Sequence, residues 1–196
     1  MGAQKPSRKR RNKMFYLGMG LFFGTHGLML VPGIRRQIVG LSSETAYMGF
    51  YSLMSLAGLV LIALGYERHH LLNLPSLPNL YQWSPIIMFL AFWMIIAANL
   101  PCWIKHWLKH PMTIGIVLWA LVHLSVSSNL HAWLMFGTFA VLMLVAALTV
   151  GVRGKTPVGS DRPPKGIFDV VAVAVGAALT ALVGYLHGTW FGVIVF

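Results

Sequence analysis

Charged residues are scarce in this chain, and acidic residues are scarcer still. Only four of its 196 residues are Asp or Glu, and charged residues make up 10% of the sequence, against 57% for hydrophobic residues. A soluble domain of average composition carries about 25% charged residues, which keep its surface solvated. The shortage of charge therefore excludes an ordinary soluble domain and indicates a membrane protein.

Cysteine and the common catalytic motifs are missing as well. The single cysteine, Cys102, excludes an intrachain disulfide and any metal cluster built from cysteines. The sequence has no phosphate-binding Walker loop and no glycine-rich dinucleotide fingerprint. Its four acidic residues lie near the ends of apolar stretches and do not pair for general acid and base catalysis. Any chemistry must then use histidine, tyrosine, tryptophan or the backbone.

The formal net charge of +11 raises the question of a nucleic-acid partner. The basic residues, however, are scattered over loops and one N-terminal tail and do not gather on a single face. Scattered Lys and Arg beside apolar segments are typical of contacts to lipid headgroups and of topology signals. We therefore expect the lipid bilayer as a partner and no nucleic acid.

Long apolar runs occupy most of the chain. A membrane-spanning helix needs about 20 predominantly apolar residues, and six stretches approach this length: Met14–Val31, Tyr47–Tyr66, Ser84–Leu100, Pro111–Val126, His131–Val152 and Val170–Val195. The predicted fold class is an all-α, polytopic transmembrane helix bundle of about six helices. Residues 1–13 are predicted to form a basic disordered tail, and residues 14–196 to form the transmembrane domain.

The orientation of the bundle depends on how its basic residues divide between the two sides. With six spans, the tail, Arg68 and the C-terminus share one side with seven Lys and Arg, while the other three loops hold eight. Without the tail, the count is one against eight. On that count, we predict a multi-pass protein of the cell inner membrane in which both termini are outside the cytoplasm. The loops containing Arg35–Arg36, Lys105–Lys109 and Arg153–Lys165 are predicted to be cytoplasmic.

Glycines four positions apart predict close contacts between helices, because they place two bare backbone patches on one face. Gly20 and Gly24 form such a pair in the first span, and Gly184 and Gly188 form another in the last span. Gly18 lies outside this pattern. We therefore expect Gly18 to tolerate a large side chain better than Gly188 does.

Three of the eight histidines, His26, His123 and His187, lie inside apolar stretches. An imidazole without a partner in hydrocarbon costs several kcal/mol, so each needs a neighbouring helix or a bound cofactor. A hydrogen bond between helices is one solution, worth about 0.6–2 kcal/mol. Haem iron is the other, because two imidazoles from different helices can hold a b-type haem in a bundle. Trp119 shares a helical face with His123, and spacing alone leaves both interpretations open.

The remaining histidines lie at or beyond the ends of the predicted spans: His69, His70, His106, His110 and His131. All of these except His110 are interpreted as interfacial polar groups. His106 and His110 are four residues apart and would share a helical face, a spacing that can bind a metal. No third ligand stands near them in the sequence, which weakens the metal interpretation.

Several longer motifs carry a resemblance to a known family. They are His26-Gly-Leu, Pro32-Gly-x-Arg35, Gly49-x-Tyr51-Ser52-Leu53-x-Ser55-Leu56-x-Gly58, His110-Pro111-x-x-x-Gly115-x-x-Leu118-Trp119-Ala120-x-x-His123-Leu124 and Leu186-His187-Gly188. Together they resemble the NnrU family of integral membrane proteins, over nearly the whole chain after Met14. The family is linked to nitrite and nitric oxide metabolism in denitrifying bacteria.

The resemblance also implies a cofactor. Relatives of the NnrU family include the 15-cis-zeta-carotene isomerases, which use haem b to isomerise a central double bond. Transferred by motif position, the haem iron ligands of this chain would be His26 and His123. We keep His110, His187 and Trp119 as secondary candidates for this site. The predicted depths of the two ligands differ, at about 8 Å and about 18 Å from the same membrane face.

The sequence leaves three functions open. The first is an NnrU-type inner-membrane protein that binds haem b and acts with a redox partner in nitrogen-oxide metabolism. The second is a haem-dependent cis-trans isomerase of a carotenoid or similar apolar polyene. Against the second, Ala120 stands where the isomerases tend to have cysteine, and Met112 where they have glutamine. The third is a haem-free membrane assembly factor whose histidines only tie helices together.

Overall fold

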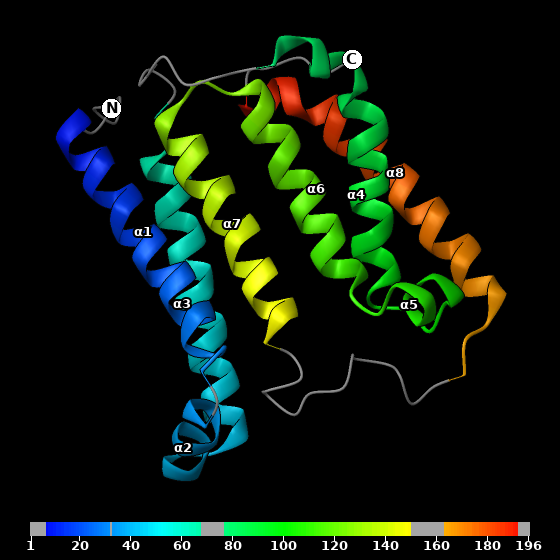
Figure 1. The fold of residues 1–196 in the computed structure, drawn as a ribbon. Coiled ribbons are helices and arrows are strands. Elements are labelled where there is room, and N and C mark those ends of the chain that lie inside the picture. The colour runs from blue at the N-terminus through cyan, green and yellow to red at the C-terminus, as the bar shows by residue number, and fades with distance from the viewer. Residues whose placement is uncertain (1–6, 32, 68–76, 150–162, 192–196) are drawn as a thin grey trace.

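A computed structural model gives the fold over residues 7–31, 33–67, 77–149 and 163–191, and its elements there are helices (Figure 1). In chain order they are α1 (Arg8–Leu28), α2 (Ile34–Leu41), α3 (Glu44–Gly65), the 3-10 helix η1 (Pro78–Trp83), α4 (Ser84–Ala97), α5 (Trp103–Leu108), α6 (Pro111–Val126), α7 (Leu130–Leu148) and α8 (Gly166–Phe191). This confirms the predicted all-α helix bundle.

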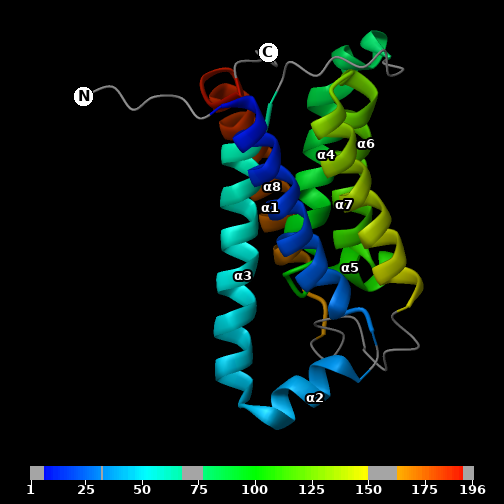
Figure 2. The ribbon, with the colours of Figure 1, turned by 90° about the vertical axis from the view of Figure 1, so that its left-hand side faces the viewer.

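The longer helices run alternately up and down and form two groups (Figure 1). α1 packs along α3 in the first group, while α4 packs between α6 and α8 in the second and α7 packs against α6. The contact of α1 with α7 joins the groups. α2 and α5 lie at one end of the bundle, and η1 and the start of α1 lie at the other (Figures 1 and 2). Figure 2 shows α2 lying across the direction of the long helices.

Each predicted span corresponds to one of the longer helices, and the fourth span, Pro111–Val126, coincides with α6. Within the described residues, four segments are long and apolar enough to cross a membrane: Glu44–Gly65, Asn79–Ala97, Leu130–Leu148 and Gly166–Trp190. α6 is apolar but has only 16 residues, which extend about 24 Å. This is shorter than a hydrocarbon core of about 30 Å.

Apolar side chains cover the outside of the bundle. On α3, Leu53, Leu56, Val60 and Leu64 are all exposed, and their spacing of three or four residues places them along one helical face. A water-soluble protein does not present a long stripe of this kind. In a bilayer the same stripe contacts lipid chains, so the surface agrees with a membrane environment.

The ends of several helices follow from single residues. The Ser43 hydroxyl accepts the Ala46 N–H at 3.1 Å and caps the start of α3. The Asn129 side chain accepts the His131 N–H at 2.8 Å and caps α7 in the same way. α6 begins at Pro111, a position where the missing N–H of proline leaves no bond unmade.

The short helices α2 and α5 lie between spans and were not predicted. Gly33, with φ of +89°, provides the left-handed turn before α2. α5 is capped from a distance, because the Asp169 carboxylate of α8 accepts the N–H groups of Trp103 and Ile104 at 3.0 and 3.1 Å. Neither helix has enough apolar residues to stand out in the sequence as a span.

The basic segment is helical over the part that the structure describes, which corrects the predicted disorder for residues 8–13. α1 begins at Arg8, ahead of the apolar run. The guanidinium of Arg11 donates to the Glu67 carboxylate at 2.5 Å, and that of Arg8 lies 3.8 Å from its second oxygen. Glu67 is buried, and its charge at the end of α3 holds the basic turns of α1 in place.

Glycine does bring helices together, and in the first predicted span it does so at a different position from the predicted pair. A Cβ on Gly18 would lie 2.6 Å from the backbone nitrogen of Ile62, and one on Gly58 would lie 2.8 Å from the backbone of Phe22. These glycines let α1 and α3 touch backbone to backbone. Gly20 and Gly24 have open space where a Cβ would be, so the contact face predicted from their spacing is wrong.

In the second group of helices, a glycine likewise allows close backbone contact at each of two helix crossings. A Cβ on Gly115 of α6 would lie 2.6 Å from the Ala91 carbonyl oxygen of α4. A Cβ on Gly176 of α8 would lie 2.9 Å from the Trp93 backbone, also on α4. α4 can therefore approach α6 and α8 closely, and this places the C-terminal turns of α6 and α8 near each other.

Candidate functional site

The three histidines predicted inside spans lie in the last turns of three different helices. His26 is two residues before the end of α1, His123 is three before the end of α6, and His187 is four before the end of α8. α1 runs toward the α2 end of the bundle, whereas α6 and α8 run toward the η1 end (Figure 1). The direction of the helices therefore groups His123 with His187 and separates both from His26.

His123 is held by its own helix and by aromatic rings. Its Nδ1 lies 2.8 Å from the carbonyl oxygen of Trp119, one turn earlier. A ring nitrogen must carry a proton to donate to a carbonyl, so this contact assigns the proton to Nδ1 and leaves Nε2 as the basic nitrogen. The ring stacks on Phe136 of α7, with centroids 4.3 Å apart. A histidine that binds a metal through one ring nitrogen usually donates a hydrogen bond from the other nitrogen to a carbonyl or carboxylate oxygen, which orients the ring.

His26 repeats this local arrangement on α1. Its Nδ1 lies 2.8 Å from the carbonyl oxygen of Phe22, and its ring packs on that phenyl ring at a centroid separation of 4.2 Å. Tyr51 of α3 covers another side at 5.1 Å. As at His123, the proton on Nδ1 leaves Nε2 as the basic nitrogen, so both predicted ligands have the required donor atom.

The structure does not bring His26 and His123 together. His123 stacks on Phe136 of α7, whereas Phe22, on which His26 packs, contacts Phe139 of the same helix. Among the described ring contacts there is none between His26 and His123. The described ring contacts of the two histidines also have no residue in common.

His123 instead faces a histidine from the last helix. The ring centroids of His123 and His187 are 6.4 Å apart, with an angle of 42° between the ring planes. Trp119 packs near His123 at 5.3 Å and against Phe136 at 4.7 Å. Two imidazoles thus lie beside aromatic side chains near the ends of α6 and α8. Of the secondary candidates, His187 and Trp119 are in this region.

His131 is the buried histidine that sequence reasoning missed. Its side chain is 0% exposed, stacks on Phe15 at a centroid separation of 4.0 Å, and accepts the backbone N–H of Glu67 through Nδ1 at 3.1 Å. The interfacial interpretation of this residue is therefore wrong. Asn129, which caps α7, also donates to the Glu67 carbonyl oxygen at 2.7 Å. The burial of His131 could not be predicted, because it depends on this contact with a segment that is distant in the sequence.

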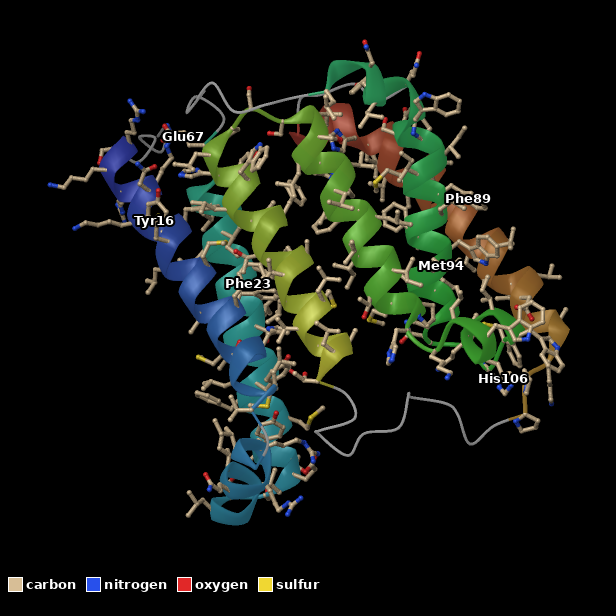
Figure 3. The ribbon with its side chains drawn as sticks, in the orientation of Figure 1. Tyr16, Phe23, Glu67, Phe89, Met94 and His106 are labelled. Carbon is tan, nitrogen blue, oxygen red and sulfur yellow. The ribbon has the colours of Figure 1, made fainter. Side chains whose placement is uncertain are left out.

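The other histidines predicted at the ends of spans lie far from His123 and His187 where the structure describes them. His106 is exposed on α5 at the α2 end (Figure 3), and His110 is the N-cap of α6. Lys109, with φ of +58°, breaks the helix between them, so they do not share the helical face predicted for a metal pair. No group of three or more His, Cys, Asp or Glu with metal-binding geometry occurs in the described ranges. His69 and His70 lie outside those ranges.

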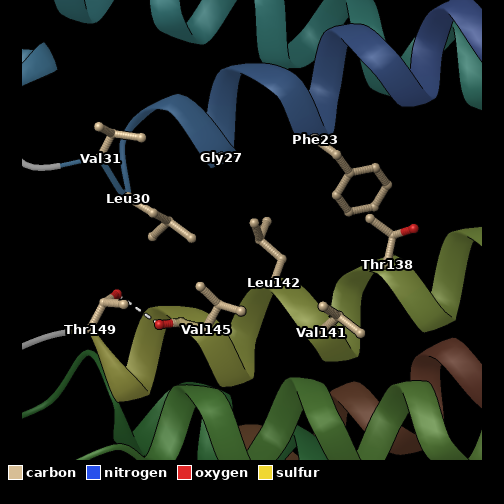
Figure 4. Close-up of a pocket in the computed structure, with 9 residues that line it drawn as sticks. All are labelled: Phe23, Gly27, Leu30, Val31, Thr138, Val141, Leu142, Val145 and Thr149. Carbon is tan, nitrogen blue, oxygen red and sulfur yellow. Dashed lines mark hydrogen bonds between the residues drawn. The ribbon is translucent and has the colours of Figure 1, made fainter.

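An apolar groove of about 510 Å³ lies between the end of α1 and α7 (Figure 4). Aliphatic side chains from both helices line it, among them Leu30, Val31, Val141, Leu142 and Val145. Two threonines also reach it, but their hydroxyls donate to carbonyl oxygens of α7 itself, as Figure 4 shows for Thr149 and Val145. The groove therefore suits an apolar molecule.

The apolar helices and the exposed aliphatic surface define a multi-pass, α-helical membrane protein. The chain belongs to the NnrU family, since the family model described as NnrU protein matches residues 14–195. This confirms the family that the motifs of the sequence resemble. No curated protein and no solved structure shows a significant match to the chain.

Proposed function

We propose that this NnrU-family protein binds haem b inside the bundle, with His123 as an iron ligand. One observation carries the proposal: the Nδ1 of His123 donates to the Trp119 carbonyl and leaves Nε2 as the nitrogen that can bind a metal. A base held in this way has the donor chemistry of an axial haem ligand. A hydrogen bond between helices would satisfy the imidazole as well, but it does not require this fixed tautomer.

The surroundings of His123 also fit an apolar, planar cofactor. Phe136 stacks on the imidazole, and Trp119 packs beside it at a tilt of 54°. Phe139 continues this aromatic surface toward α1, where it contacts Phe22 and Phe23. When bound, haem would supply one-electron redox chemistry at its iron. The chain itself would orient the ligand nitrogen and exclude water.

The cellular role follows from the family resemblance. We place the protein in the inner membrane, in redox metabolism of nitrite and nitric oxide, with a redox partner. The resemblance also implies His26 as the second ligand, and that pairing stays a prediction.

An absorption spectrum of the detergent-purified protein is the direct test. We expect a Soret band that is lost or strongly diminished in His123→Ala, while the protein still inserts into the membrane. His106→Ala is the matched control, because this exposed histidine on α5 is far from the site and should leave the band intact. A wild-type protein without a Soret band, after expression with ample haem, would instead favour the haem-free assembly factor.

The groove between α1 and α7 keeps one alternative function open, a haem-dependent isomerase of a carotenoid or similar polyene. An apolar cleft without available polar groups can hold part of a long hydrocarbon (Figure 4). Co-expression in bacteria that make a cis-carotene tests this alternative. A change in the pigment isomers that depends on the protein, and is lost when Val141→Trp fills the groove, would support it. Unchanged pigments would count against it.

A further inference from the structure

The separation of His123 and His187 distinguishes between two ways in which they could interact. An N–H···N hydrogen bond of about 3 Å, extended by about 1 Å to each ring centre, gives centroids about 5 Å apart. Two imidazoles on opposite sides of one metal ion, with bonds of about 2 Å, have centroids about 6 Å apart. The separation of 6.4 Å in the structure agrees with the second arrangement.

The fold gives a reason for this placement. α8 reaches the end of α6 because both helices cross α4 closely, at Gly176 and Gly115. At the other end of α8, Asp169 caps α5, which fixes the start of the helix. The last turns of α6 and α8 thus meet at a defined level, and each presents a histidine there.

We propose that His187, in place of His26, would hold the haem iron together with His123. This inference rests on the proposed function. It gives α8 a role in the site, where His187 of α8 would act together with His123 of α6. It also requires no movement of α1, because the two ligands already lie on neighbouring helix ends.

The spin state of the iron tests this assignment, because two imidazole ligands make the iron six-coordinate and low-spin. We expect optical and electron paramagnetic resonance spectra of the wild-type haem protein to be low-spin. In His187→Gly the Soret band should remain, since His123 still binds, but the iron should become high-spin. Added imidazole should fill the space left by the missing ring and restore the low-spin spectrum.

His26→Gly is the matched control, because it removes the other intramembrane imidazole in the same way. It should stay low-spin, with or without imidazole. Low-spin spectra in His187→Gly, or a high-spin, imidazole-sensitive spectrum confined to His26→Gly, would overturn the assignment. If His187→Gly does not fold, His187→Met replaces it: a methionine ligand should keep the low-spin state and raise the reduction potential, and an unchanged potential would count against His187.

The failure of this inference and that of the proposed function can be told apart. A wild-type protein that lacks a Soret band removes haem binding altogether, and the assignment of His187 with it. A wild-type protein that binds haem through His123, but whose spin state does not respond to any change at His187, removes only the assignment of the second ligand.

Discussion

The ring of His131 lies between Phe15, on which it stacks, and the backbone of Glu67, whose N–H it accepts. The Glu67 carboxylate in turn accepts a hydrogen bond from Arg11. Three helices therefore meet at one buried imidazole: the start of α1, the end of α3 and the start of α7. These contacts indicate a structural role for His131, in contrast to the cofactor role proposed for His123.

We expect His131→Ala to destabilise the protein by about 3 kcal/mol or more. The change leaves a cavity beside Phe15 and removes the acceptor of a buried N–H. Thermal unfolding in detergent would measure the effect, with exposed His106→Ala as a control close to wild type. The haem content per folded molecule should not change in either variant. Equal melting temperatures for the two variants would contradict the structural role.

Sequence reasoning at this scale identified the residues with donor chemistry but not their pairing. In both His26 and His123, Nδ1 bonds to a backbone carbonyl and leaves Nε2 as the possible metal ligand, and their pairing stays a prediction. The roles of His131 and Glu67 could not be predicted, because they depend on a contact between segments 64 residues apart. A histidine one residue inside a helix looks interfacial until its covering side chain, Phe15, is known.

At the scale of the helix, the contact between α1 and α3 depends on bare backbone at Gly18 and Gly58. Helices in a membrane gain little from burying apolar surface against one another, since lipid is equally apolar. Close packing of backbones therefore contributes a large share of their attraction. Gly18 was expected to tolerate a large side chain better than Gly188, yet a Cβ on Gly18 would meet the backbone of Ile62. The comparison with Gly188 stays a prediction.

We expect Gly18→Ala to lower stability by about 1–3 kcal/mol, since the added methyl must push α1 away from α3. Gly24→Ala is the matched control on the same helix, where a Cβ meets open space, and it should be neutral or slightly stabilising. Melting temperatures of the two variants in the same detergent give the comparison. If Gly18→Ala and Gly24→Ala had the same melting temperature, the close contact at Gly18 would not exist in solution.

The positions of the longer helices in the sequence were largely predictable, whereas the helices that each one packs against were not. Apolar run length located the spans, and Pro111 fixed the start of α6. α2 and α5 were not predicted because each is too short to stand out as an apolar run, and because the cap of α5 comes from Asp169, more than 60 residues later. Helices pack together where small residues on both of them allow close approach. The spacing of glycines in one helix does not show the matching position on its partner.

At the scale of the whole molecule, the fold places α2 and α5 at one end and the starts of α1 and η1 at the other (Figures 1 and 2). The charge distribution predicts that the α2 end is cytoplasmic. We therefore expect a C-terminal alkaline phosphatase fusion to be active and a C-terminal fluorescent reporter that needs the cytoplasm to be dark. The reverse pattern would place α2 and α5 outside the cytoplasm.

The ion pair between Arg11 and Glu67 has a consequence for how the chain enters the membrane. Its two partners are 56 residues apart, so during synthesis the basic turns of α1 emerge long before the carboxylate that neutralises them. α1 cannot reach its final environment until α3 has been made. The first two spans are thus expected to settle as a helical hairpin, and the order of synthesis is part of the way this bundle is assembled.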